Sequence, residues 1–67
     1  MEWKLLASSS SVEGIQGCIN KFFFSENYLV DPETLKISNP ELPDKNFDNF
    51  RVIKKRNRYR FEHLSSR

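Results

Sequence analysis

The chain has 67 residues, a formal net charge of +2 and 37% hydrophobic residues. This length allows a single small domain over residues 1–67, near the lower limit for a stable core. Six Phe, two Tyr and one Trp supply enough apolar area to argue against disorder. One cysteine and one histidine exclude an internal disulfide and a Cys/His zinc site.

The N-terminal stretch "MEWKLLASSSS" predicts neither secretion nor membrane insertion. It lacks the basic start of a signal peptide, and its apolar run is too short. No stretch reaches the roughly 18 apolar residues of a spanning helix. A lone thiol fits a reducing compartment. We therefore expect a cytoplasmic protein with no membrane contact.

Charge is distributed unevenly along the chain. Residues 1–50 carry four Lys and eight acidic residues, for a net charge of −4. Residues 51–67 carry seven Lys or Arg and one acid, Glu62, for a net charge of +6. Such asymmetry indicates either an electrostatic partner or an internal acidic counterpart.

A strand followed by a helix is predicted at the N-terminus. In "EWKLLA", residues 2–7, period-two alternation puts Trp3 and Leu5 on one face, and Leu6 follows where the strand ends. The four serines at 8–11 indicate a turn that ends in a helix cap. Ser10 with Glu13 fits a capping box, in which each side chain binds the other residue's backbone N–H.

The predicted helix runs from about Ser11 to a point between Lys21 and Ser25. Its apolar stripe, spaced by three and four residues, consists of Val12, Ile15, Ile19 and Phe22, with Cys18 beside it. Either Asn20 ends the helix or Asn27 supplies a left-handed cap further on. The stripe through Phe22 favours the longer helix. Gly14 and Gly17 line one side, where a sheet or a second helix could approach closely.

The middle of the chain predicts a hairpin and then a loop. Two β-prone runs in "YLVDPETLKIS" flank a turn, where Pro32 pre-sets one dihedral angle and Asp31 can bond back to the turn amides. Leu35 and Ile37 share a face. Residues 39–46 hold two prolines and no apolar period, which predicts a surface loop. We expect residues 65–67 to form a frayed tail.

The last segment predicts a second hairpin with a two-residue turn at Arg56 and Asn57. Arg tolerates the left-handed conformation of such a turn less readily than Asn, so a longer loop is the alternative. The short turn makes Lys55 face Arg58, Lys54 face Tyr59, Ile53 face Arg60, Val52 face Phe61 and Arg51 face Glu62. One face then holds Phe50, Val52, Tyr59, Phe61 and His63, and the other holds Arg51, Lys55, Arg58, Arg60 and Glu62.

Together these segments predict an α+β fold. Its order is β-α-β-β-β-β, with the single helix packed on a small, mainly antiparallel sheet and a basic C-terminal β-hairpin.

The basic hairpin is the candidate binding site. The residues that we expect to contact nucleic acid are Arg51, Lys54, Lys55, Arg56, Arg58, Tyr59 and Arg60. Clustered cations on a β-ribbon can follow a phosphate backbone, and the planar fork of Arg donates two bonds to one phosphate. The competing interpretation is that exposed strands carry Lys and Arg for solubility and to prevent edge pairing. Like charges facing across the ribbon destabilise a hairpin, which counts mildly against a purely structural use.

The aromatic residues of this segment do not predict a base-stacking platform. Tyr59 and Phe61 alternate with Arg58 and Arg60, so the rings and the cations face opposite sides. We expect Phe61 to be buried and the contacts to be mainly with phosphates, with weak sequence preference. Tyr59, near the tip, is the possible exception.

Other patterns carry little chemistry. "GIQG", residues 14–17, matches a GxxG clamp only superficially, because that clamp needs two helices. Cys18 and His63 could pair as nucleophile and base, but the thiol falls beside the apolar stripe. The carboxylates are scattered over turns and loops. We therefore expect no catalysis, no metal and no cofactor.

The sequence thus favours a small, non-enzymatic binding module that contacts DNA or RNA phosphates. The alternative is a protein-interaction or regulatory module, for which a homodimer is one form. In that case exposed aromatic residues, among them Trp3, Phe23, Phe24 or Phe47, would form the interface and the basic ribbon would bind an acidic partner.

Overall fold

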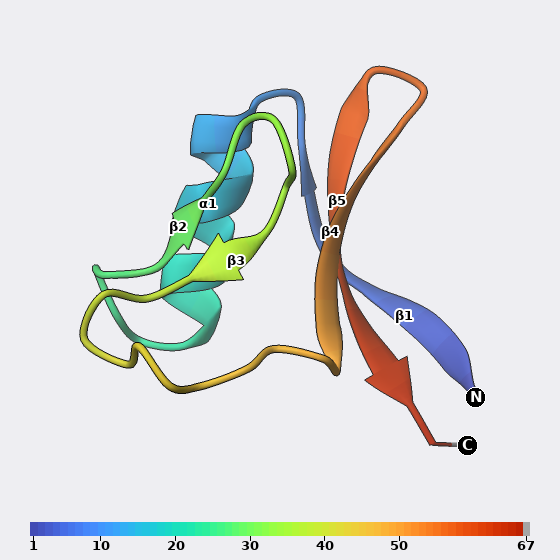
Figure 1. Ribbon diagram of the computed structural model, residues 1–67. Helices are drawn as coiled ribbons and strands as arrows, with labels where there is room; N and C mark the ends of the chain where they lie inside the picture. The colour runs from blue at the N-terminus through green and yellow to red at the C-terminus, as the bar shows by residue number, and fades with distance from the viewer. Residues whose placement is uncertain (67) are drawn as a thin grey trace.

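A computed structural model describes residues 1–66 (Figure 1). Its elements are β1 (Glu2–Ser9), α1 (Val12–Phe22), β2 (Leu29–Val30), β3 (Ile37–Ser38), β4 (Phe50–Lys55) and β5 (Arg58–Ser65). One helix and antiparallel strands in the order β-α-β-β-β-β confirm the predicted α+β fold.

The strands form two sheets. One has three antiparallel strands in the order β1-β5-β4, and the other is the small hairpin of β2 and β3. Figure 1 shows α1 and the β2–β3 hairpin on the same side of the larger sheet. The opposite face of the larger sheet therefore has no covering layer in the described residues.

The core lies between α1, β2 and the larger sheet. Its buried hydrophobic residues are Ile15, Ile19, Tyr28, Val30, Val52 and Phe61. Phe61 is fully buried, as expected, and its ring stacks on Phe50 with centroids 5.7 Å apart. Phe22 and Phe23 meet the same Phe61 ring edge-on. The core thus rests on an aromatic cluster centred on Phe61.

The first strand is longer than predicted. Ser8 and Ser9 pair with Arg60 and Tyr59, so these serines belong to β1 and not to a turn. The register shifts between Leu5 and Ala7, which makes Leu6 a β-bulge and not the end of the strand. Both expectations were wrong because backbone pairing with β5 extends β1 beyond its apolar alternation.

The helix begins one residue later than the capping pattern indicated. Ser11 is the N-cap, and its Oγ accepts the N–H of Gly14 at 2.9 Å. The predicted capping box of Ser10 and Glu13 is therefore wrong. Because β1 continues through Ser9, the chain can turn into the helix only after Ser10.

The helix ends at Phe22, within the predicted range of Lys21 to Ser25, so neither Asn20 nor Asn27 ends it. The left-handed residue that follows is Phe24, with φ 53°, and not Asn27. Asn20 stays within the helix and joins it to the chain ahead of β2. Its side-chain amide donates to the carbonyl of Tyr28 at 3.2 Å, and its side-chain oxygen accepts the N–H of Tyr28 at 2.7 Å.

The two helix glycines have different surroundings. A side chain on Gly14 would collide with the hydroxyl of Ser9, which confirms a close approach to β1. Nothing lies within 4 Å of the position that a Cβ on Gly17 would take. The predicted close approach is therefore wrong at Gly17.

The turn of the middle hairpin forms the predicted hydrogen bonds from its backbone amides to Asp31. The Asp31 side chain accepts the N–H groups of Glu33 and Thr34, at 2.7 and 3.0 Å. These backbone bonds lower the pKa of the Asp31 carboxyl below its ordinary value. Residues 39–46 contain turns and no helix or strand, as predicted. In the expected tail, Ser65 still pairs with Glu2, and Arg67 lies outside the described residues.

Candidate nucleic-acid interface

The C-terminal hairpin has the predicted register. Lys55 faces Arg58, Ile53 faces Arg60, and Arg51 faces Glu62. Arg56 and Asn57 form the two-residue turn, with φ values of 52° and 66°. Two successive positive φ values are the signature of a type I′ turn, whose twist matches that of the flanking strands.

The residues that were assigned to the two faces of the hairpin lie there as predicted, whereas Ile53 falls on the cationic face and Lys54 on the core face. Val52 and Phe61 face α1 and are buried. Lys55 and Arg58 belong to the opposite face and are exposed. Tyr59 is half-buried against the core, and the Nζ of Lys54 lies 5.5 Å from its ring centroid.

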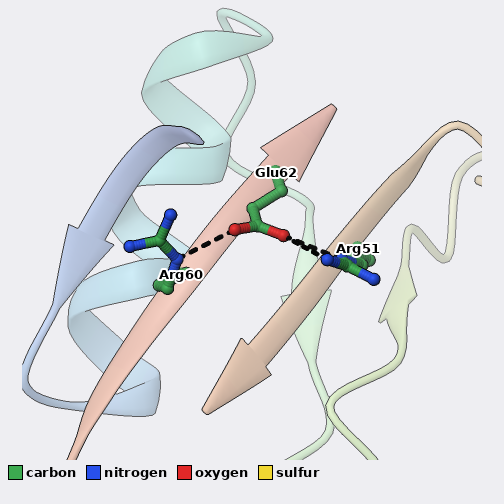
Figure 2. A network of polar contacts seen from close by, with 3 residues as sticks. All are labelled: Arg51, Arg60 and Glu62. Carbon is green, nitrogen blue, oxygen red and sulfur yellow. Dashed lines mark hydrogen bonds and ion pairs between the residues drawn. The ribbon is translucent and has the colours of Figure 1, made fainter. Parts of the chain in front are cut away.

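Glu62 is a buried acid on the otherwise cationic face. It is only 4% exposed, and its carboxylate accepts hydrogen bonds from two neighbouring arginines (Figure 2). Arg51 reaches it from β4, with Nη2 2.7 Å from Oε1. Arg60, on the same strand as Glu62, places Nε 2.8 Å from Oε2. The carboxylate thus holds two of the predicted site residues in an internal ion-pair network.

Contacts with two arginines stabilise the ionised form of the Glu62 carboxylate. Burial disfavours the ionised form, but hydrogen bonds from Arg60 and Arg51 outweigh it, and the pKa of Glu62 lies below its ordinary value. Arg51 also packs its guanidinium 4.1 Å from the ring centroid of Trp3. Arg51 is therefore held on two sides within the sheet.

The remaining cations gather at the end of the hairpin. We call Lys55, Arg56 and Arg58 the cationic tip. All three are exposed, and none forms an ion pair with a carboxylate within residues 1–66. Arg58 donates from Nη2 to the hydroxyl of Ser8 at 3.3 Å. The tip lines a concavity of about 400 Å³ together with Ser8 and Arg60.

Two members of this site were missed in the sequence. Ser8 reaches the tip only because β1 extends through the serines and pairs with β5. No local pattern indicated that pairing. Glu62 carried a signal, because it is the only acid in residues 51–67 and lies opposite Arg51 in the predicted register.

The other candidate residues are distributed over the molecule. Cys18 is half-buried on α1, whereas the His63 ring lies 4.8 Å from that of Phe50. No hydrogen bond joins Cys18 and His63 in the described part of the chain. Of the proposed interface aromatics, Phe23 and Phe47 pack against the core, and Phe24 is 97% exposed.

Residues 1–66 contain no group of three or more His, Cys, Asp or Glu placed to hold a metal ion. No helix among them has the length and apolar character needed to cross a membrane.

Comparison of the chain with protein-family models, with curated proteins and with solved structures finds no match.

Proposed function

We propose that this protein is a small, non-enzymatic binding module, located in the cytoplasm, that contacts nucleic-acid phosphates through its cationic tip. The observation that carries the proposal is the exposure of Lys55, Arg56 and Arg58 around one concavity, without carboxylate partners in the described residues. Ser8 adds a hydroxyl to this concavity. Cations and hydroxyls are the groups that proteins use most to hold phosphate oxygens.

The cationic tip carries positive charges at positions where they lower the stability of the hairpin. Arg56 occupies a positive-φ position that Asn, Asp or Gly would adopt with less strain. Lys55 and Arg58 lie directly opposite each other, and like charges there destabilise the pair. Both features are consistent with selection for binding at the expense of hairpin stability.

The ion pairs define which residues would bind. Arg51 and Arg60 are both bound by Glu62, which neutralises one of their two positive charges and holds both side chains within the sheet. The expected phosphate contacts are therefore Lys55, Arg56 and Arg58, whereas Lys54 lies on the other face of the hairpin, near the ring of Tyr59. Phe61 is buried and Tyr59 is half-buried, so base stacking contributes little and sequence preference should be weak.

A salt titration tests this proposal. Binding of labelled mixed-sequence oligonucleotides, duplex and single-stranded, is measured by fluorescence anisotropy between about 50 and about 200 mM salt. Arg56→Ala and Arg58→Ala should each reduce the slope of log affinity against log salt by about 1. Lys21→Ala, an exposed cation on α1, is the matched control and should leave the slope unchanged. Absence of binding at low salt, or equal slopes for all variants, would contradict the proposal.

Self-association or binding of a protein partner is the second candidate function. Leu6 and Phe22 are 39% and 46% exposed and line a shared concavity with Cys18, which leaves apolar surface beside α1. Light scattering over a range of protein concentrations tests the homodimer. A monomer at every concentration would leave only a different protein as the partner.

A further inference from the structure

Two strand edges line one groove on the core side of the molecule. β4 is an edge strand of the larger sheet, and β3 is an edge strand of the small hairpin. Residues 34–37 and residues from Phe47 to Val52 together line a concavity of about 330 Å³. Figure 1 shows β3 between β2 and β4, and residues beside both of these edges line the groove.

The β4 edge offers main-chain groups without a strand partner. In a two-residue hairpin the residues that flank the turn exchange both hydrogen bonds, so Lys55, Ile53 and Arg51 bond to β5. The N–H and C=O groups of Val52 and Lys54 therefore point away from β5. Within residues 1–66 they form no hydrogen bond with another element.

The β3 edge has the same property. The N–H of Asp31 donates to the carbonyl of Lys36 at 3.0 Å, which makes Asp31 and Lys36 a bonded pair. The next pair, Val30 and Ile37, must then direct its main-chain groups outward. The N–H of Val30 confirms this direction, because it donates to Oε1 of Gln16 on α1 at 2.9 Å. The main-chain groups of Ile37 point to the opposite side, away from β2.

We propose that this groove binds an extended segment of a partner protein. The segment would pair with Ile37 of β3 on one side and with Val52 and Lys54 of β4 on the other. It would thereby join the two sheets into one, in the order β2-β3-segment-β4-β5-β1. Main-chain pairing at an exposed sheet edge is a general mode of peptide recognition.

The lining of the groove defines the chemistry of the segment. Its core side consists of Leu35, Ile37, Phe50 and Val52, all packed against or within the core. Lys36 is exposed on the opposite face of the same edge, and Lys55 is exposed on that face of β4, beyond the lining of the concavity. The lining also holds Arg51, which Glu62 binds, and Asp48, so the acidic side chains of the segment must lie beside the two lysines and away from Asp48. Neither lysine forms an ion pair in the described residues. The fitting segment alternates apolar with acidic side chains, apolar ones inward and acidic ones outward beside the lysines.

The proposal does not depend on nucleic-acid binding, because its main-chain contacts lie on the β3 and β4 edges; Lys55 is the one residue that it shares with the cationic tip. The test is NMR titration of the full ¹⁵N-labelled chain with a short capped peptide in which valine and glutamate alternate. The amide signals of Ile37, Val52 and Lys54 should shift, and these amides should exchange more slowly with solvent when the peptide is bound. Arg58→Ala should bind the peptide as the natural chain does.

Two matched controls separate strand pairing from charge attraction. The same peptide with N-methyl groups on two amides of one edge keeps its charge but loses two donors, and should bind about tenfold more weakly. Lys36→Glu should weaken binding about threefold, whereas Lys21→Glu, outside the groove, should not change it. Lack of binding, equal binding of the N-methylated peptide, or shifts confined to the cationic tip would each overturn the proposal. So would self-association of the chain through the same amides, since the occupant would then be a second copy.

Discussion

Glu62 divides the cations of the hairpin into two groups with different roles. It is buried on the sheet face that lacks a covering layer, and Arg51 and Arg60 contact its two oxygens. A buried carboxylate needs such partners, because ionisation away from water is otherwise unfavourable. The two arginines are therefore held by the fold, whereas the three cations of the tip have no carboxylate partner in the described residues.

Glu62→Gln should destabilise the protein. Glutamine keeps the shape but removes the charge that Arg51 and Arg60 share, and both arginines retain partial contact with water. We expect the free energy of unfolding to fall by about 1–2 kcal/mol. Urea unfolding followed by the fluorescence of Trp3 measures this change. Glu26→Gln, at an exposed residue, should change the value by less than about 0.5 kcal/mol. Equal stability of both variants would contradict the assigned role.

The same carboxylate predicts a dependence on pH. Its pKa is lower in the folded chain than in the unfolded chain, so its contribution is complete above the ordinary glutamate pKa of about 4.3. The contribution is lost as the pH falls from there through the lower, folded-state pKa. Stability of the natural chain should therefore drop more steeply over this acidic range than that of Glu62→Gln. The pKa of Asp31 is also lowered, and Asp31 is still present in Glu62→Gln. The stability of this variant should therefore still fall with decreasing pH, but less steeply.

At the scale of the single helix, the glycines predict opposite outcomes for the same substitution. Gly17→Ala places a methyl group in open space and should raise the free energy of unfolding by about 0.5–1 kcal/mol. Gly14→Ala gains the same helix propensity but collides with the side chain of Ser9, so we expect no gain or a loss. Thermal or urea unfolding of the two variants in parallel checks this. A larger gain at Gly14 than at Gly17 would contradict the packing described.

At the scale of the hairpin, changes in the turn should affect stability and oligonucleotide binding in opposite directions. The double variant Arg56→Asn with Asn57→Gly places preferred residues at both positive-φ positions and should raise the free energy of unfolding by about 1 kcal/mol. It also removes a tip cation, so its salt slope for oligonucleotide binding should fall by about 1. Arg56→Lys keeps both the charge and the strain and should match the natural chain in both measurements. A double variant that is more stable and binds equally well would exclude a role for Arg56.

The extent to which the sequence predicted each element follows from the range of the interactions that form it. The β4–β5 hairpin was predictable to the residue, because its turn and its alternation lie within one short segment. The extension of β1 through Ser8 and Ser9 was not, since it depends on pairing with β5, at the other end of the chain. That one long-range pairing also moved the helix cap to Ser11 and brought Ser8 to the cationic tip.

At the scale of the whole molecule, stability should depend on the aromatic cluster around Phe61. A domain of this length has roughly 3–10 kcal/mol of stability, and a buried Phe→Ala change removes about 3–5 kcal/mol. Phe61→Ala should therefore leave much of the chain unfolded in circular dichroism. Phe24→Ala makes the same chemical change at a residue that is 97% exposed and should be tolerated. A cooperative, fully folded Phe61→Ala would show that the core lies elsewhere.

The pairing of Glu2 with Ser65 places both ends of the described chain side by side at one end of the sheet. In Figure 1 the Arg56–Asn57 turn lies at the opposite end of the molecule. A short linker could therefore close the chain into a ring, with new termini opened in the loop at 39–46, without crossing the sheet. Such a circular permutant, or a fluorescent label attached at either end of the chain, would leave the cationic tip unobstructed.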